Sequence, residues 1–543
     1  MEGKKTQLKE EQLQVINHNE GDLIVSASAG SGKTFVMIER LIRLICEKKA
    51  DVSEILAVTY TESAAAEMKA KLKAALEKRL KEAPDAFLTE QFNKIAYSDI
   101  STVDSFCSRL IRRYFFKIGC APDYRIADDK IAAPLKALAI DKTFREFYEK
   151  KDPEFLKVVE RHTSARSDEG LKGLVLGIYN FCSTEADPEK LLNASDKYYT
   201  EEGCRELSDN LLIGYMQKFD GFYNDFKSAK DKFSSCGLKK GEAFCDAYLG
   251  LIDSLKGCKD LSKMVEIFGG FYYKTEFESK LTGDARDLQE SVKKKKAALL
   301  KLKEKIAVQS KLISDFKDNY VEYYKHTKVI AELVKSFSAN FSAAKREENL
   351  LDFADIERFA LEILKDESAR EEIKNKYKYV FIDEYQDVNG LQEEILNHIK
   401  KDNLFMVGDV KQSIYGFRGC RYEFFAEKYK KMSCEKDQAI TLNYNFRSAS
   451  AVIDLVNEIF SFSMKKELFG EDYSKSSKLI SGGIYPDGAV GRAQIHMYCT
   501  KEKRNTAAEE PRIYDVLEEI RGEEEDEISK SAALIVKIIE EEL

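Results

Sequence analysis

Short apolar runs alternate with longer amphipathic segments near the N-terminus. The run DLIVSASAGSGKT (22–34) precedes FVMIERLIRLICEKK (35–49), in which apolar residues recur at helical spacing. ILAVTYT (55–61) and SAAAEMKAKLKAALEKRLKEA (63–83) then repeat the same order of a β-type run and a helix. This alternation predicts an α/β unit with a parallel sheet.

The same alternation returns much later in the chain. YKYVFIDEY (377–385), LFMVGD (404–409) and AITLNYN (439–445) have strand character and stand between helical segments. From residue 121 to residue 349 strand-like runs are few, and Lys, Glu, Tyr and Phe dominate. We therefore predict one α/β domain interrupted by a helical insertion, because a crossover connection between parallel strands tolerates an insertion.

One long charged helix is predicted within this insertion, over LQESVKKKKAALLKLKEKIAVQSKLISDF (288–316). Its run Lys293 to Lys296 is interpreted as a solvated helix face rather than as a binding patch. Later in the chain, the acidic stretch Glu523 to Glu527 follows Gly522 and is interpreted as a linker.

Composition bounds the class of protein. A chain of 543 residues is too long for a single core and predicts two to four domains. The net charge of −8 does not indicate nucleic-acid binding, although a local basic groove is compatible with it. The eleven cysteines include no CxxC pair, and no apolar run reaches the length of a membrane span. These features predict a cytoplasmic protein with reduced thiols that does not bind a membrane.

A nucleotide site is indicated by ASAGSGKT, Ala27 to Thr34. It fits the phosphate-binding pattern G-x-x-x-x-G-K-[ST], except that Ala27 replaces the first glycine. Gly30 and Gly32 allow successive backbone N–H groups to curl around a phosphate at a helix N-terminus. Lys33 reaches the β- and γ-phosphates, and Thr34 offers its hydroxyl to Mg²⁺. The whole loop, Ala27, Ser28, Ala29, Gly30, Ser31, Gly32, Lys33 and Thr34, is therefore predicted to bind ATP.

The metal-organising carboxylates are predicted at the end of the run YVFIDE. Asp383 would hold Mg²⁺, and Glu384 would orient and deprotonate the attacking water. A DE dipeptide alone is common. It becomes informative here because it follows an apolar strand and accompanies a phosphate loop.

Further segments resemble, in family order, the motifs of the UvrD/Rep-like superfamily 1 DNA helicases. They are LKEEQLQVI (8–16), VTYTESAAAEMKAKL (58–72), ISTVDSFCSRLIRRY (100–114), LLDFADI (350–356), DEYQDVNGLQ (383–392), GDVKQSIYGFRG (408–419) and LNYNFRS (442–448). The resemblance implies a P-loop RecA-like parallel sheet domain with a large helical insertion and a partial second RecA-like domain. The implied domains are 1–120 and 350–438 for the first RecA-like domain, 121–349 for the insertion, and 439–543 for the second.

The resemblance also implies roles for single residues. Around ATP, Gln12 would read the adenine edge, Phe446 would stack on adenine, and Gln412 and Arg447 would contact the γ-phosphate, Arg447 in the manner of an arginine finger. On single-stranded DNA, the implied contacts are Tyr60, Thr61, Thr102, Tyr415, Phe417 and Arg418. Base stacking on an aromatic ring is sequence-tolerant, which suits the rings in this set.

Some departures narrow the branch of the family. Phe35, Glu62 and the wording of GDVKQSIYGFR resemble the AddA (RecB-type) helicase–nuclease subunit. Asp104 stands where that branch usually has His, which puts one DNA-backbone contact in doubt. No later helicase motif and no nuclease cluster follows Ser448, so the chain is expected to match the N-terminal part of an AddA-like protein.

The predicted function is an ATP- and Mg²⁺-dependent DNA helicase or translocase, 3′ to 5′ by resemblance, in double-strand-break repair and recombination. An AddB-like partner subunit is implied by the same resemblance. Two alternatives stay open at this point: an ATP- and single-strand-binding fragment without turnover, and a repair ATPase with a coiled-coil insertion. The second needs an LSGG-type signature, which LKDESAREEIKNKYKY (364–379) does not contain.

Overall fold

The structure is a computed structural model that describes residues 8–19, 21–162, 167–273, 277–278, 283–433, 439–464, 473 and 477–483. The chain forms two compact units. The first comprises residues 1–27 and 33–442, and the second comprises residues 28–32 and 443–543. The predicted acidic linker at Glu523–Glu527 and the predicted second domain after residue 483 lie outside the described residues.

A six-stranded sheet organises the first unit. Its strands lie in the order β3-β2-β6-β7-β1-β8, and every neighbouring pair is parallel. The strands are β1 (Leu23–Ala27), β2 (Ile55–Thr59), β3 (Asp99–Thr102), β6 (Tyr379–Ile382), β7 (Leu404–Gly408) and β8 (Ala439–Leu442). The predicted α/β fold with a parallel sheet is confirmed.

Strand β8 corrects one predicted boundary. The sequence assigns residues 439–442 to the start of the second domain, but β8 pairs with β1, with Ile24 opposite Ala439 and Ala27 opposite Leu442. This pairing makes β8 the edge strand of the first sheet. The sequence pattern predicts a strand here, but it does not predict which strand pairs with it. Backbone hydrogen bonds between segments that are distant in sequence leave no local signal.

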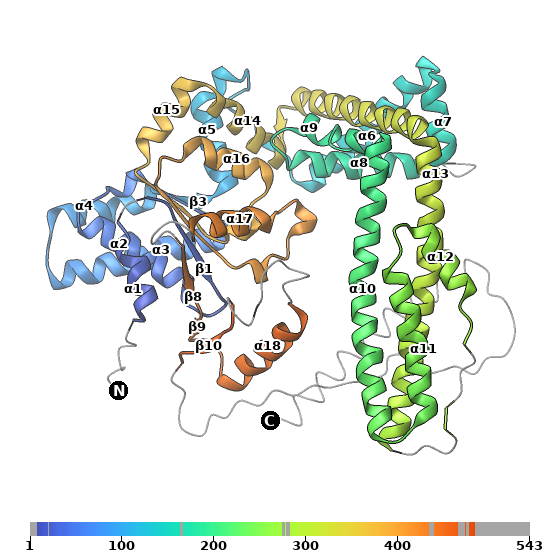
Figure 1. Cartoon of the computed structure of the whole chain (residues 1–543). Helices are drawn as coiled ribbons and strands as arrows, with labels where there is room; N and C mark the ends of the chain where they lie inside the picture. The colour runs from blue at the N-terminus through green and yellow to red at the C-terminus, as the bar shows by residue number, and fades with distance from the viewer. Residues whose placement is uncertain are drawn as a thin grey trace, which may run out of the picture. The chain divides into compact units, whose positions relative to one another are not determined.

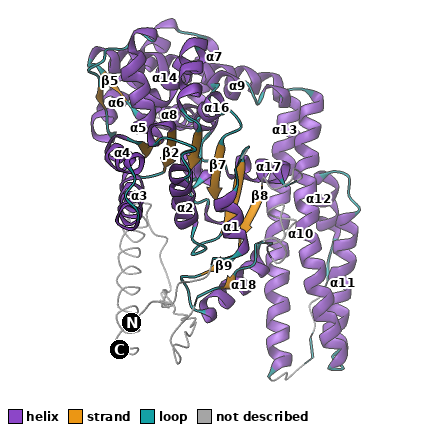
Figure 2. Cartoon of the chain, turned by 90° about the vertical axis from the view of Figure 1, so that its left-hand side faces the viewer, coloured by secondary structure: helices purple, strands orange, loops and turns teal. Residues whose placement is uncertain are grey.

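Helices cover both faces of this sheet (Figure 2). One face carries α1 (Glu10–Asn17), α2 (Lys33–Cys46), α3 (Glu62–Glu82) and α4 (Ala86–Lys94). The other carries α5 (Val103–Tyr114), α14 (Phe353–Lys365), α15 (Glu367–Lys376), α16 (Gly390–Ile399) and α17 (Tyr422–Met432). Because successive strand side chains point to opposite faces, Leu56 and Val58 pack on the second layer while Ala57 packs on the first. Both faces are buried, which explains the continuous apolar runs of the strands.

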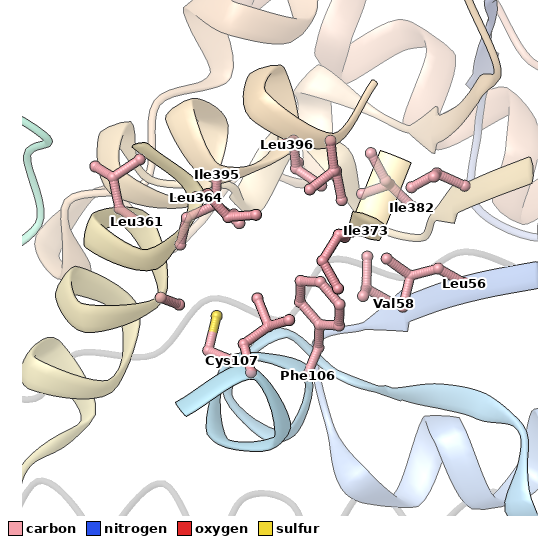
Figure 3. Close-up of a cluster of buried hydrophobic side chains, with 14 of the residues drawn as sticks. Leu56, Val58, Phe106, Cys107, Leu361, Leu364, Ile373, Ile382, Ile395 and Leu396 are labelled. Atoms are coloured by element: carbon pink, nitrogen blue, oxygen red, sulfur yellow. The ribbon is translucent and has the colours of Figure 1, made fainter. Parts of the chain in front are cut away.

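Figure 3 shows part of the core on the second face. Leu56 and Val58 of β2 and Ile382 of β6 lie against Phe106 and Cys107 of α5. Leu361 and Leu364 of α14, Ile373 of α15, and Ile395 and Leu396 of α16 complete the labelled cluster. The insertion separates α5 from α14 in sequence, yet both helices belong to this one core. The two halves of the α/β domain therefore fold together across the insertion.

The insertion is helical, as predicted. Its helices are α6 (Asp129–Lys150), α7 (Pro153–His162), α8 (Glu169–Ser183), α9 (Pro188–Leu192), α10 (Glu201–Ser235), α11 (Lys239–Lys256), α12 (Leu261–Gly270) and α13 (Asp284–Glu347). The short strands β4 (Arg125–Ile126) and β5 (Leu350–Leu351) pair in parallel where the chain leaves and re-enters the α/β domain.

Two separate hydrophobic clusters stabilise the insertion. One joins α6, α7 and α8 to the last third of α13, and the other joins α10, α11 and α12 to its first half. Helices α10 and α13 run side by side and antiparallel (Figure 1), with Tyr215 against Gln309 and Asp225 against Lys295. Just before α10, Tyr199 bonds Thr327 of α13. We call the distal part of this assembly, residues 216–308, the helical arm.

The predicted long helix at 288–316 lies within α13, so this prediction is confirmed. Within its lysine run, Lys293 pairs with Glu290 and Lys295 pairs with Asp225 at the surface. The described part of the second unit contains β9 (Tyr444–Asn445) and β10 (Ile480–Ser481), which pair in parallel, and α18 (Ser450–Ser463). Among the described residues, no helix is long and apolar enough to span a membrane.

Candidate nucleotide site and nucleic-acid interface

The predicted chemistry of the first unit gathers at the carboxyl edge of the sheet. Tyr60 follows β2, Thr102 ends β3, Asp383 follows β6 and Asp409 follows β7. Lys33 begins α2, the helix that comes after β1. Because all six strands are parallel, these ends share one edge, which is where ligands bind in open α/β sheets.

The backbone of the phosphate loop explains its two glycines. Gly30 has φ +71° and Gly32 has φ +88°, in the left-handed region that glycine adopts without strain. A Cβ on Gly30 would also lie 2.9 Å from the Cβ of Arg447 and from the side chain of Asn445. The positive φ and the lack of space for a Cβ therefore require glycine at position 30. The neighbouring residues Ser28 and Ser31 are buried.

The second unit ties this loop to the LNYNFRS segment. Asn445 Nδ2 donates to the carbonyl of Ala29 over 2.8 Å, and the N–H of Phe446 donates to the carbonyl of Gly30 over 2.9 Å. Asn445 Oδ1 accepts from the N–H of Arg447 over 2.9 Å. The predicted residues Phe446 and Arg447 are thus held beside the loop by hydrogen bonds through the loop backbone and Asn445, a residue that the sequence did not single out.

Lys33 and Glu384, predicted separately from two motifs, are in direct contact. Lys33 Nζ lies 2.9 Å from Oε1 and 2.7 Å from Oε2 of Glu384, an ion pair with both oxygens. Glu384 itself has φ +52°, an unusual conformation for a residue with a side chain. The turn after β6 therefore aims Glu384 at the lysine.

The same turn concentrates negative charge. Burial, and after it the charge of the adjacent Glu384, raises the pKa of Asp383 to about 6. Burial and then Glu384 likewise raise the pKa of Asp387 to about 6. Carboxyl groups with raised pKa values are those that a bound cation would stabilise in the charged form.

These residues fit Mg²⁺ as part of a nucleotide complex. In the described part of the chain, no group of three or more His, Cys, Asp or Glu side chains is arranged to hold a metal by itself. Mg²⁺ in nucleotide sites takes only one or two protein ligands and completes its shell with phosphates and water. Asp383 and Thr34 supply oxygens of the required kind.

Gln412 lies in the loop after β7, as predicted, and a second carboxylate holds it. Gln412 Nε2 donates to Asp409 Oδ2 over 2.7 Å, and Lys411 Nζ lies 2.8 Å from Asp409 Oδ1. Asp409 is buried. Gln412, which is expected to contact the γ-phosphate, is therefore held by Asp409 before a nucleotide binds.

Four of the predicted DNA-contacting residues form one cluster. The rings of Tyr60 and Tyr415 stack with centroids 4.9 Å apart, and the ring of Phe417 lies 6.1 Å from that of Tyr415. Arg418 Nη1 donates to the hydroxyl of Tyr60 over 3.1 Å. Phe417 is 80% exposed. We call Tyr60, Tyr415, Phe417 and Arg418 the aromatic cluster; it offers solvent an aromatic surface beside a cation.

The other predicted polar residues act locally as helix caps. Thr61 accepts from the N–H of Ala64 at the start of α3, and Thr102 accepts from the N–H of Ser105 at the start of α5. On α1, Gln12 Oε1 accepts from the N–H of Lys9 over 3.1 Å. Their expected contacts with DNA or adenine stay predictions.

A cavity of about 430 Å³ lies next to the aromatic cluster. Tyr60, Thr102, Arg418, Asp104 and Glu357 are among its lining residues. Burial raises the pKa of Asp104 to about 6, with Glu62 contributing, and burial raises the pKa of Glu357 to about 7, with Asp104 contributing. Asp104, the departure from the family pattern, therefore lies together with Glu357 in an acidic hollow.

Lys33 after β1, facing two carboxylates after β6 of a parallel sheet, defines a P-loop nucleotide-binding protein with a RecA-like α/β fold. The chain belongs to the UvrD/REP helicase family, because the profile of the UvrD/REP helicase N-terminal domain matches residues 8–433. Membership of this family rules out the coiled-coil repair ATPase of another P-loop class.

Curated relatives of the AddA type, which are named as subunits of an ATP-dependent helicase/nuclease, refine this assignment. The protein of Clostridium botulinum is 32% identical over 98% of this chain, and that of Syntrophomonas wolfei is 34% identical over 87%. A third, from Carboxydothermus hydrogenoformans, is 34% identical over 90%. These matches confirm the predicted resemblance to AddA. The chain spans less than half the length of these relatives, between 39% and 45%.

Several residues of the site have no role assigned from sequence. Gln386 and Asp387 lie inside the motif DEYQD, and Asp409 lies inside GDVKQ, so position in a motif was the available signal. Glu357 lies in α14, where the helical spacing of apolar residues predicts the helix but gives no indication that this glutamate belongs to the site. Their roles depend on neighbours that only the fold brings close.

Proposed function

We propose that this chain is the ATP-driven motor part of an AddA-like DNA helicase. The observation that carries the proposal is the ion pair of Lys33 with Glu384 beside Asp383, at the same sheet edge as the exposed aromatic cluster. Lys33, Asp383 and Glu384 lie at the same edge of one sheet as the base-stacking surface, so hydrolysis can be linked to movement along DNA.

ATP would bind with Mg²⁺ in the following arrangement. Backbone N–H groups of residues 28–32 would surround the phosphates, Lys33 would contact the β- and γ-phosphates, and Thr34 and Asp383 would hold the metal. When ATP arrives, Lys33 exchanges Glu384 for phosphate, which frees Glu384 to orient the attacking water. Gln412 and Arg447 would contact the γ-phosphate, and Gln12 and Phe446 the adenine.

Single-stranded DNA would bind across the aromatic cluster. Phe417 is largely exposed, and base stacking on a ring contributes about 1–3 kcal/mol per base. Thr61 and Thr102 would contact the backbone at the starts of α3 and α5. Polarity from 3′ to 5′, a role in double-strand-break repair, an AddB-like partner and a cytoplasmic location belong to this proposal through the resemblance to AddA.

The test is ATPase activity of the purified chain with and without oligo(dT), together with calorimetric binding of Mg·ATP. We expect DNA to stimulate turnover and Lys33→Ala to abolish detectable nucleotide binding. Normal ATP binding by Lys33→Ala would show that the nucleotide site is elsewhere.

A second candidate is a unit that binds ATP and DNA without turnover. The observation that favours it is that Lys33 occupies both oxygens of Glu384, the residue that must act on water. This candidate would be supported over the motor if the chain binds both Mg·ATP and oligo(dT) but releases no phosphate, with or without oligo(dT).

A further inference from the structure

The buried side chain of Gln386 lies between the turn after β6, which carries Glu384, and the turn after β7, which carries Asp409. It is 1% exposed. Its amide Nε2 donates to Glu384 Oε2 over 3.0 Å and to Asp387 Oδ2 over 3.1 Å. Its Oε1 accepts from the N–H of Asp409 over 2.9 Å. One side chain thus bonds both the turn after β6 and the turn after β7.

The chemistry of these partners fixes the orientation of the amide. The N–H of Asp409 only donates, so it requires the oxygen of Gln386. The carboxylates of Glu384 and Asp387 accept when ionised, so they require the NH₂ group. A flipped amide would place two donors together on one side and acceptors together on the other. All three hydrogen bonds are satisfied by one orientation only.

From Asp409 the hydrogen bonds continue into the loop after β7, which carries Tyr415, Phe417 and Arg418 of the aromatic cluster. The Asp409 carboxylate accepts from Gln412 Nε2 over 2.7 Å and from the N–H of Lys411 over 3.1 Å. Ser413 Oγ donates to the backbone carbonyl of Gln386 over 3.4 Å. Two residues beyond Ser413 stands Tyr415, whose ring stacks on Tyr60. A hydrogen-bonded path therefore leads from Glu384 through Gln386 and Asp409 to Gln412.

Close packing leaves Gln386 little freedom to move alone. A Cβ on Gly408 would lie 2.4 Å from Gln386 Oε1 and 3.1 Å from the ring of Phe425. The last residue of β7 is thus a glycine where Gln386 approaches the strand. A shift of the loop after β7 has to be accompanied by a shift of Gln386.

We propose that Gln386 is a positioning residue that couples occupancy of the DNA surface to the placement of Glu384. The Glu384 carboxylate bonds two side chains of the described part of the chain, Lys33 and Gln386. Once phosphate takes Lys33, the bond to Gln386 is kept, and the position of Gln386 follows the loop that carries Tyr415 and Phe417. The inference rests on the proposed function. It assigns the coupling between ATP binding and single-stranded DNA binding to the buried amide of Gln386.

The test measures coupling as a ratio of affinities. Binding of a fluorescent oligo(dT) is measured by anisotropy with and without Mg·AMP-PNP, a non-hydrolysable ATP analogue. By linkage, the ratio of the two dissociation constants is the coupling factor, typically about 5–150-fold in allosteric proteins. In Gln386→Met, which keeps the length of the side chain and removes the amide, we expect a factor within about twofold of one.

Gln91→Met is the matched control. Gln91 is also fully buried and also bonds two partners through its amide, the N–H of Val52 and the carboxylate of Asp51. It lies on α4, a helix that supplies none of the site residues. We expect Gln91→Met to keep the wild-type coupling factor. Gln386→Glu is the second variant: it keeps an acceptor for the N–H of Asp409, loses the donor to Glu384, and is also expected to lose coupling.

The outcomes separate the inference from the function beneath it. A wild-type coupling factor in both Gln386 variants, or a wild-type factor of one, overturns the inference. An equal loss in Gln386→Met and Gln91→Met also overturns it, because the role is then general to buried amides. If the wild-type chain binds neither AMP-PNP nor oligo(dT), the proposed function itself has failed.

Discussion

At the scale of the residue, the site depends on side chains that hold one another in place. Lys33 is held by Glu384, Gln412 by Asp409 and Arg418 by the hydroxyl of Tyr60. Each group expected to contact a ligand thus starts from a defined position. Binding exchanges one partner for another, which costs less than burying an unpaired charge.

The Lys33–Glu384 pair leads to a prediction about nucleotide affinity. Glu384→Gln removes the charge that ATP must displace from Lys33, so Mg·ATP should bind about tenfold more tightly, equivalent to about 1.4 kcal/mol. Hydrolysis should fall by about 10²–10⁴-fold with the loss of a general base. Calorimetry and phosphate release measure the two effects.

The control for this variant is Glu394→Gln, a substitution of a glutamate on α16 that contacts His398. It should leave both affinity and turnover unchanged. Weaker binding of Mg·ATP by Glu384→Gln would contradict the ion-pair interpretation.

Phe417 gives a prediction about DNA. Phe417→Ala should weaken single-strand binding by about 1–3 kcal/mol, because a stacked base loses its ring. The slope of log affinity against log salt should stay unchanged, because a phenyl group releases no counterions. Phe116, an exposed ring that follows α5 at 66% exposure, supplies the control Phe116→Ala. A changed salt slope with little loss of affinity at low salt would count against stacking.

At the scale of the element, the last turn of α13 joins the insertion to the α/β domain through one buried lysine. Lys345 Nζ lies 2.7 Å from Asp352 and 2.5 Å from Asp355. These two carboxylates form the capping box that begins α14. The ammonium group also lies 4.2 Å from the ring centroid of Phe341. The junction of α13 and α14 thus depends on a buried cation that compensates two partly buried carboxylates.

Lys345→Met should therefore destabilise the protein by about 3–5 kcal/mol at pH 8, because it leaves two carboxylates without their cation. Burial and Asp352 already raise the pKa of Asp355. A carboxyl whose pKa is raised on folding contributes stability that is complete below its unfolded pKa and is lost as pH rises. The penalty should accordingly be smaller at pH 5 than at pH 8.

Urea denaturation followed by circular dichroism measures the change. Lys335→Met, on the same helix, is the control, since Lys335 pairs with Glu189 at the surface and should contribute less than about 1 kcal/mol. An equal effect of the two substitutions would contradict the account of the junction.

At the scale of the whole molecule, the chain builds separate cores from interleaved segments. Both faces of the sheet have their own cluster, and the insertion has two more. The cluster of the helical arm draws its members from α10 to α13 and includes no residue of the sheet or of the helices that cover it. The arm should therefore be separable from the nucleotide site.

Replacing residues 216–308 with a four-residue Gly-Ser linker tests this. Tyr215 and Gln309 face each other across the antiparallel pair α10 and α13, so a short linker can join them. We expect Mg·ATP affinity within about twofold of the full chain, because the sheet and its two clusters are untouched. Loss of nucleotide binding, with helicity otherwise retained in circular dichroism, would show that the arm supports the site.

Elements with local signals were predictable from the amino-acid sequence. Apolar runs predict the strands β1, β2, β6 and β7, helical spacing predicts α2 and α13, and the residues that follow the strands point to Lys33, Asp383 and Glu384. Such patterns are readable because burial on both faces of a sheet requires continuous apolar residues, and phosphate binding requires glycine at particular positions.

Features that depend on contacts between distant segments became visible only in the folded chain. Folding places β8 in the first sheet, brings α5 and α14 into one core across the insertion, and sets Gln386 between Glu384 and Asp409. Hydrogen-bond partners, burial and raised pKa values are properties of neighbours in space. In the sequence, Glu357 and Lys345 are ordinary charged residues of predicted helices. Their roles follow from burial and from neighbours in the folded chain, which the sequence pattern does not show.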